Sequence, residues 1–264
     1  MLKKLLKYEY KATARMMLPI YLLVLVLSLG MRASIAVLDR DVDEWLAVIC
    51  IFVIVLFVIS VIAVFVMQMV ITINRFRLNL LSDEGYVMFT LPVSVHQLVW
   101  SKLIVSVTWM IGALLVTILS VGIITMNVNI FLDMIREILA ALSRFTTYYA
   151  LNVTAVVLES LAVTLVSCIS GALQMYAAMA IGYSCDRHKF AISIGVYVGF
   201  QFVMQMVLQV ILTPLLLNLD MFRTMEPMLA VHITMLGTAL WSVAVGAVFY
   251  FITTHMLTNK LNLE

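Results

Sequence analysis

Few residues in this chain have side chains that commonly carry out catalysis or bind metals, and their spacing matches no such site. The three cysteines form no CxxC pair and have no histidine at metal-ligand spacing, and the sequence lacks HExxH, GxSxG and the spaced aspartates of CDP-alcohol transferases. The four histidines are dispersed near the ends of apolar segments: His96, His188, His232 and His255. We therefore expect no catalytic residue, no metal site and no enzyme, and we interpret Cys50, Cys168 and Cys185 as buried free thiols.

Polar residues inside the apolar segments form a second group. Three glutamines recur every fourth residue and so share one face of a helix: Gln201, Gln205 and Gln209. Glu159 is the only acidic residue that we place inside an apolar segment, a position that favours a functional role. The neighbouring Ser160 and Thr164 are alternative partners for its carboxylate. Both the glutamines and Glu159 fit the lining of a transport pathway, and both also fit hydrogen bonding between helices.

A seam of small and polar residues follows Glu159 at steps of four and three, a spacing suited to closely packed helices. Its members are Ser160, Thr164, Ser167, Gly171, Gln174 and Ala178, and Gly195 with Gly199 repeats the small-residue spacing. We interpret both as sites of helix packing, and we keep Gln174 as a candidate for either the pathway or packing.

Membrane-spanning helices must position these residues. The 264-residue chain is 64% hydrophobic and only 11% charged, with a mean hydropathy of +1.13, which leaves too little polar surface for a water-soluble globule. A helix needs about 20 apolar residues to cross roughly 30 Å of hydrocarbon. Six segments qualify: 16–37, 46–73, 103–126, 150–183, 190–216 and 229–254. We therefore expect an all-α, polytopic integral membrane protein, with residues 1–264 forming a single transmembrane domain.

The distribution of Lys and Arg predicts the orientation of these six spans. Eleven of the 16 basic residues fall on one side, which the positive-inside rule assigns to the cytoplasm together with both termini. The first outer loop is acidic: Asp39, Asp41, Asp43 and Glu44 surround Arg40. The N-terminal segment also resembles a signal peptide cleaved after Ser34-Ile35-Ala36. We favour an uncleaved anchor, because the apolar segment is long, ends in Arg32 and is preceded by Glu9.

Residues 1–15 predict an amphipathic helix on the inner leaflet. Its basic face carries Lys4, Lys7, Lys11 and Arg15, and its apolar face carries Leu2, Leu5 and Leu6. Glu9 and Thr13 interrupt the apolar face, and a carboxylate there is costly without a polar partner. Two interpretations stay open: a fraying surface helix with Glu9 among the headgroups, or a face that packs on protein.

A polar interruption at 73–108 gathers charged, turn-forming and amphipathic residues between two apolar segments. We expect the second span to continue through Arg77, and a short helix over 82–91 with Ser82 as its cap. Pro92 then breaks the chain, and Ser94 caps the helix that leads into the third span. Tyr86, Met88 and Phe89 are then available to a protein partner. An ordinary interfacial loop, with aromatic residues at the headgroup level, is the alternative.

Two strings in this half of the chain carry a family resemblance: RFRLNLLSDEGYVMFTLPVSVHQLVWSKLI and KLLKYEYKATARMMLPIYLLVLVL. They resemble the cytoplasmic loop and the N-terminus of type-2 ABC exporter permeases, in particular bacterial permeases without a nucleotide-binding domain of their own. The resemblance implies a connecting helix that includes Lys4, Lys7, Glu9 and Lys11. It also implies a coupling helix that fits a cleft on an ATPase through Asp83, Glu84, Gly85, Tyr86, Phe89 and Leu91. The segment Leu91-Pro92-Val93-Ser94 and Lys102 match the family's usual start of the third span. Beyond about residue 110 only the six-span topology agrees.

The resemblance also implies the partners. The sequence contains no GxxxxGK[ST] motif, so ATP and Mg²⁺ would be bound by a separate ATPase subunit. We expect a second permease chain, identical or paralogous, a lipid environment in the bacterial cell membrane, and no nucleic-acid partner. The expected function is that of an exporter permease for hydrophobic or amphipathic cargo. The alternative is a non-transporting membrane module, such as the substrate-binding component of an importer or a sensor subunit of a resistance complex.

Overall fold

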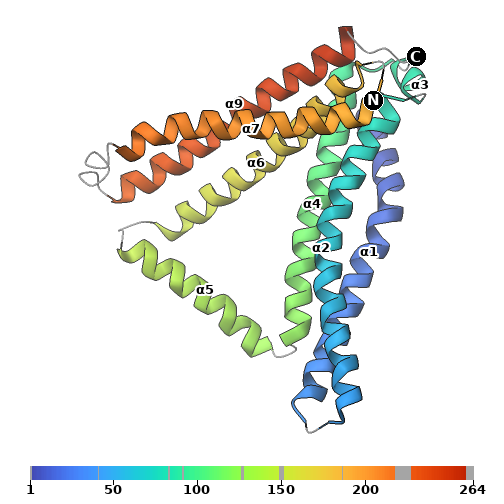
Figure 1. The fold of residues 1–264 in the computed structure, drawn as a ribbon. Coiled ribbons are helices and arrows are strands. Elements are labelled where there is room, and N and C mark those ends of the chain that lie inside the picture. The colour runs from blue at the N-terminus through green and yellow to red at the C-terminus, as the bar shows by residue number, and fades with distance from the viewer. Residues whose placement is uncertain are drawn as a thin grey trace. The chain divides into compact units, whose positions relative to one another are not determined.

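The computed structural model contains only α-helices as regular elements across the residues it describes, which are 2–40, 42–82, 84–90, 92–125, 128–148, 152–185, 187–217 and 227–259. The eight helices of the described residues, coloured in chain order in Figure 1, are α1 (Leu2–Leu38), α2 (Glu44–Leu80), α3 (Glu84–Thr90), α4 (Val95–Thr125), α5 (Val128–Tyr148), α6 (Val153–Gly182), α7 (Lys189–Leu217) and α9 (Pro227–Asn259). The predicted all-α class is confirmed.

Six of these helices are long and apolar enough to cross a membrane: α1, α2, α4, α6, α7 and α9. The shortest apolar stretch, Lys189–Val210, has 22 residues, and at about 1.5 Å per residue it covers the roughly 30 Å hydrocarbon core. Helices suit these segments because each one pairs its own backbone N–H and C=O groups where lipid offers none. The chain is thus a multi-pass membrane protein by the length and hydropathy of its helices.

The N-terminal helix differs from the prediction. The amphipathic segment 1–15 was expected as a separate helix lying on the inner leaflet, but α1 runs without interruption from Leu2 to Leu38. No glycine or proline lies between Ala12 and Leu18, and Pro19 lies inside the helix without ending it. A proline there removes one backbone donor, which a long helix tolerates when the remaining hydrogen bonds hold. The basic segment and the first span therefore form one element.

The connection between the third and fourth spans also differs from the prediction. The sequence was interpreted there as a connection without an assigned element, whereas the structure forms the 21-residue helix α5. Its charged residues fall on one side and its large apolar residues on the other. Because this alternation has a period near 3.6, it was visible in the sequence but not as an uninterrupted apolar run.

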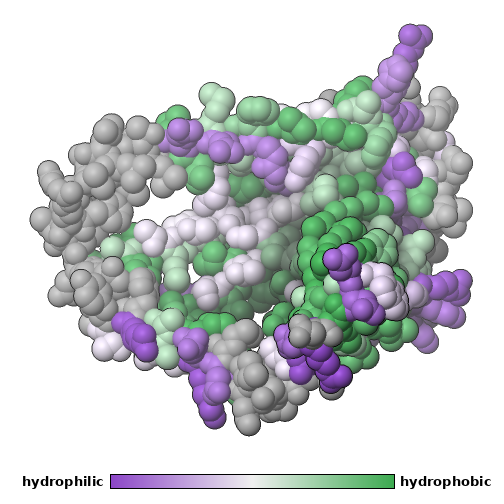
Figure 2. Space-filling view, turned by 60° about the horizontal axis from the view of Figure 1, so that its bottom comes forward, coloured by the Kyte–Doolittle hydropathy of each residue, from purple (hydrophilic) through white to green (hydrophobic). Residues whose placement is uncertain are grey.

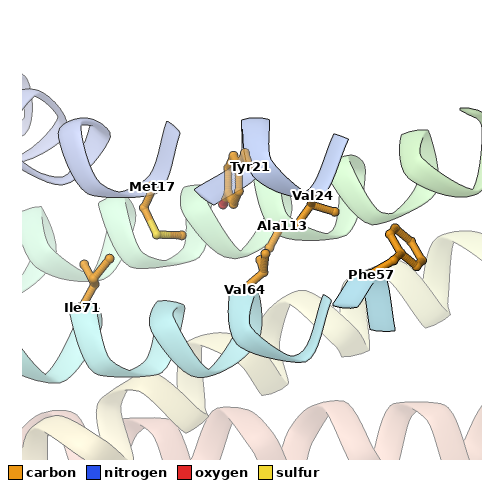
Figure 3. Packing of buried hydrophobic residues seen from close by; sticks show 7 residues of the cluster. All are labelled: Met17, Tyr21, Val24, Phe57, Val64, Ile71 and Ala113. Carbon is orange, nitrogen blue, oxygen red and sulfur yellow. The ribbon is translucent and has the colours of Figure 1, made fainter. Parts of the chain in front are cut away.

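The chain divides into two compact units, and the first comprises residues 1–72 and 104–140. Its apolar core is built from three helices and is shown in Figure 3: Met17, Tyr21 and Val24 of α1, Phe57, Val64 and Ile71 of α2, and Ala113 of α4. The Tyr21 hydroxyl donates to the Trp109 carbonyl at 2.5 Å. A Cβ at Gly112 would lie 3.2 Å from the Tyr21 hydroxyl oxygen, so the absence of a side chain on α4 makes room for that ring.

The second unit comprises residues 73–103 and 141–264, and α6 is its central helix. It packs against both α9 and α7. The contact is close where side chains are small: a Cβ at Gly246 would lie 3.6 Å from Ser170, and one at Gly182 would overlap the backbone of Ser193. The predicted seam packs only in part. A Cβ at Gly171, Gly195 or Gly199 would meet no described atom within 4 Å, so these three glycines mark no close approach within the described chain.

The outer surfaces of the spans are apolar. Large hydrophobic side chains are exposed along all six, among them Leu22 of α1, Phe52 of α2, Leu115 of α4, Leu161 of α6, Phe202 of α7 and Phe251 of α9. Figure 2 shows hydrophobic residues covering much of the visible face, with hydrophilic residues in separate patches. Such exposure is expected where lipid tails surround the helices.

Candidate functional site

The polar interruption folds into a short helix between two turns. The Ser82 hydroxyl donates to the Leu78 carbonyl at 2.5 Å and so closes the end of α2. The Ser82 side chain therefore does not cap α3 as predicted. The Ser82 backbone carbonyl instead accepts the Gly85 N–H at 2.7 Å. At the other end, the Gln97 N–H donates to the Ser94 hydroxyl oxygen at 3.3 Å, which confirms the predicted cap of α4.

The helix α3 spans Glu84–Thr90, inside the predicted coupling segment 82–91. Tyr86 is 53% exposed, Met88 and Phe89 are half-buried, and Gly85 is buried. Asp83, Leu91 and the side chain of Glu84, all predicted to take part in coupling, lie outside the described residues. An exposed tyrosine beside half-buried Met and Phe side chains is the composition that protein interfaces favour.

The end of α2 that leads into α3 is anchored on α6 and α7. Phe76 and Tyr176 are both buried and stack with ring centroids 4.2 Å apart and an angle of 8° between the planes. One residue later, the Arg77 guanidinium lies 5.8 Å from the centroid of the Phe190 ring, within the range of a cation–π contact. The chain before α3 is therefore fixed to two spans of the second unit.

The first turns of α4, the helix that follows α3, contact α9. The His96 Nδ1 and the Tyr250 hydroxyl are 2.6 Å apart, and the Trp100 ring centroid lies 6.0 Å from that of Tyr250. Further along α4, Lys102 is buried and engaged with neighbouring groups. The segments on both sides of α3 thus contact α6, α7 and α9.

The basic N-terminal part of α1 has one exposed and one buried face. The exposed face carries the predicted residues Lys4, Lys7 and Lys11. Glu9 is only 6% exposed, and Thr13 is buried, where its hydroxyl oxygen accepts the Trp109 Nε1–H at 2.7 Å. Next to it, the Tyr10 hydroxyl donates to Thr108 at 2.7 Å. Of the two interpretations of this face, packing on protein is the one observed.

Glu159 pairs with a residue that the sequence did not reveal. Its two carboxylate oxygens lie 2.9 and 2.8 Å from the Nδ1 of His232 on α9. The nearby hydroxyls, given above as alternative partners, bond elsewhere: Ser160 donates to the Val157 carbonyl and Thr164 to the Ser160 carbonyl. Glu159 lies in the second turn of α6 and His232 in the second turn of α9, so the pair joins two parallel spans at similar depth.

A small polar cavity lies among α6, α7 and α9. Its volume is about 190 Å³, and it is lined by Ser167, Ser170, Gly171, Gln174, Met204, Trp241, Ser242 and Val245. The hydroxyls of Ser167 and Ser242, both in its lining, form a hydrogen bond with each other at 3.1 Å. Gln174 is 8% exposed, and its buried Nε2 has no hydrogen-bond partner among the described residues. An amide donor without a partner therefore lies buried beside the cavity, in the part of the wall that Gln174 contributes.

The three glutamines of α7 do not contribute to the interior of the described chain. Gln201, Gln205 and Gln209 are all exposed, and the Gln201 Nε2 donates at 3.1 Å to the Tyr197 hydroxyl one turn earlier. The structure thus separates the predicted intramembrane residues into three places. Glu159 joins α6 to α9, Gln174 lines the cavity, and the glutamines lie on an outer face of α7.

The residues that sequence reasoning missed are mostly long-range partners. His232, Tyr176 and Tyr250 lie more than 70 residues from Glu159, Phe76 and His96. No local periodicity connects residues so far apart, and only their position near helix ends gave a signal.

Among the described residues no group of three or more His, Cys, Asp or Glu side chains is placed to hold a metal ion.

Comparison with protein-family models, curated proteins and solved structures finds no match to this chain.

Proposed function

We propose that this chain is the permease subunit of an ATP-driven exporter, that it forms half of the translocation pathway, and that it couples to a separate ATPase through α3. The observation that carries the proposal is the arrangement around α3. Tyr86 is exposed on this seven-residue helix, while the residues before and after the helix contact α6, α7 and α9. A surface loop without a partner has no need of such anchoring on three spans.

The contacts suggest how force would travel. ATP and Mg²⁺ would be bound in the partner, since the sequence has no phosphate-binding loop. Closure of two ATPase subunits would displace α3, and the stacked Phe76 and Tyr176 would pass the displacement to α6. The contacts of Arg77 with Phe190 and of His96 with Tyr250 would move α7 and α9 with it. Rigid-body movement of packed helices is an established way of switching a pathway between its two sides.

The exposed glutamines support a second permease chain. Gln201 and Gln205 lie well inside α7 and point away from the described chain. A primary amide that faces hydrocarbon loses its hydrogen bonds to water, at a cost of about 2 to 7 kcal/mol. Contact with another polypeptide or with a water-filled pathway removes that cost. Pairing of two chains along this face would supply both, because six spans make half of a pathway.

The Gln174 cavity suggests what the pathway would recognise. Its walls combine apolar side chains with the free Gln174 amide and serine hydroxyls. Such a site fits a hydrophobic molecule that carries a hydrogen-bond acceptor, such as a carbonyl group. This is consistent with amphipathic cargo of the peptide or lipid class.

A test of coupling compares variants of Tyr86 in the complex purified from native membranes through a tag on this chain. Loss of an interface anchor commonly costs 1.4 kcal/mol or more, so Tyr86→Ala should lower ATP hydrolysis per mole of chain about tenfold. Tyr86→Phe keeps the ring and should retain most of the activity. Trp45→Ala, an exposed aromatic residue at the far end of α2, serves as the matched control and should have no effect.

All variants must elute as the wild type does in detergent, so that a folding defect is separated from a coupling defect. Unchanged ATP hydrolysis in Tyr86→Ala would contradict the proposal. So would a wild-type complex that hydrolyses no ATP, a result that would favour the non-transporting membrane module.

A further inference from the structure

The helix α5 is amphipathic over its whole length. At 100° per residue, its four charged residues fall on one face: Asp133, Arg136, Glu137 and Arg144. The opposite face carries Ile135, Ile138, Leu139 and Leu142. In the structure both faces are open. Ile138 and Leu139 are 60% and 50% exposed, and the charged side chains are exposed as well.

The position of α5 in the chain places it at a membrane surface. It lies between two spans, and only residues 126–127 separate it from α4 and residues 149–152 from α6. At no more than about 3.6 Å per residue, these connections keep both ends of α5 close to the ends of the two spans. Since α4 begins beside α3 and crosses the bilayer, α5 belongs to the face opposite α3, which is the outer face in the expected orientation.

A transmembrane path for α5 is disfavoured by its charges. Four ionised side chains lie between residues 133 and 144, the middle of the helix, where burial in hydrocarbon is most costly. Arg136 and Asp133 pair at 3.0 Å, but both remain largely exposed. In an interfacial orientation the same residues stay in water while the apolar face enters the acyl chains.

We propose that α5 is an interfacial helix whose occupant is the outer leaflet of the bilayer, with the Ile138 and Leu139 face inserted among the acyl chains. Two observations favour lipid over protein. The ends of α4 and α6 that adjoin α5 in the chain also expose large apolar side chains, namely Ile118, Leu119, Leu158 and Leu161. The charges on the polar face also balance, two acidic against two basic, so this face offers no net charge to a charged partner.

The balanced charge of α5 leads to a second expectation, which concerns anionic lipid. Attraction to anionic headgroups scales with excess Lys and Arg near the surface. Because α5 has no excess, apolar insertion alone holds it, and its depth does not depend on the anionic lipid content.

Fluorophore quenching in vesicles tests the proposal on the full chain. In a background of Cys50→Ala, Cys168→Ala and Cys185→Ala, single cysteines replace Ile138 or Leu139 on one face, and Glu137 or Arg144 on the other. Each is labelled with bimane and reconstituted in phosphatidylcholine that contains a lipid with a doxyl group near the headgroup. We expect doxyl to quench the first pair at least about twofold more than the second, and aqueous iodide to show the reverse order.

Four outcomes would overturn the proposal. Iodide quenching of both pairs would place the whole helix in water, and insensitivity of the first pair to both quenchers would mean that protein covers it. Quenching of the Glu137 and Arg144 positions by a doxyl group at the chain terminus would indicate a spanning helix. A several-fold change on replacing a third of the lipid by phosphatidylglycerol would show that charge, not apolar insertion, sets the depth.

Discussion

At the scale of single residues, the interior of the second unit contains two kinds of polar group. Glu159 and His232 satisfy each other across α6 and α9, whereas Gln174 keeps a buried donor free beside a cavity. A free donor costs stability, and a paired one contributes to it. The pair therefore fits a structural role, and the cavity fits a role in binding cargo.

A double-mutant cycle measures the contribution of the Glu159–His232 pair. We expect Glu159→Ala and His232→Ala each to destabilise the protein, and the double variant to be more stable than the sum predicts. Interhelical hydrogen bonds in membranes contribute on average about 0.6 kcal/mol and at most about 1.7, and the coupling energy should fall in that range. The measurement is the free energy of unfolding in mixed micelles with increasing denaturing detergent.

The matched control is Ser160→Ala, because the Ser160 hydroxyl donates only within its own helix. Combined with His232→Ala it should give additive effects. Additive effects for Glu159 and His232 themselves would contradict the pairing.

At the scale of elements, α3 depends on the segments at either side of it. Phe76 and Tyr176 are fully buried and stacked, so they tie the end of α2 to α6. This contact lies at the end of α2, next to the helix α3 through which we propose that force is transmitted. Its loss should therefore weaken both the fold of the second unit and the coupling.

We expect Phe76→Ala to cost about 3 kcal/mol, because it removes a buried ring and leaves a cavity. Phe76→Leu fills part of that space and should cost less. Phe52→Ala, which removes an exposed ring on the same helix, should change stability by less than about 1 kcal/mol. Thermal unfolding in detergent compares the stability of the three variants. Equal losses of stability in Phe76→Ala and Phe52→Ala would contradict a stabilising contact between Phe76 and Tyr176.

The elements were predictable to the extent that one physical signal dominated each segment. Long apolar runs predicted the six spans, and Ser94 predicted the start of α4 because a cap is a local interaction. The boundary at residue 15 was wrong because a polarity change does not end a helix without a breaking residue. The helix α5 was missed because its apolar residues alternate with charges. The partners of Glu159 and Phe76 depend on tertiary packing, which no local pattern records.

At the scale of the whole molecule, two features on the surface of the described residues do not fit an isolated chain. Tyr86 is exposed on α3, and the glutamines of α7 face outward from within an apolar helix. Each makes sense when covered: Tyr86 by a soluble partner, the glutamines by a second chain or a water-filled pathway. Both features fit the proposal that the chain is one subunit of a larger assembly.

Site-specific photocrosslinking from position 86 in native membranes tests whether α3 docks on an ATPase. With p-benzoylphenylalanine in place of Tyr86, we expect an ultraviolet-dependent adduct to a soluble protein whose sequence contains GxxxxGK[ST], identified by mass spectrometry of the crosslinked peptide. The same substitution at Trp45, at the opposite end of α2, should give no such adduct. Adducts to lipid alone at position 86, or to a protein without a nucleotide-binding motif, would contradict the claim that α3 docks on an ATPase.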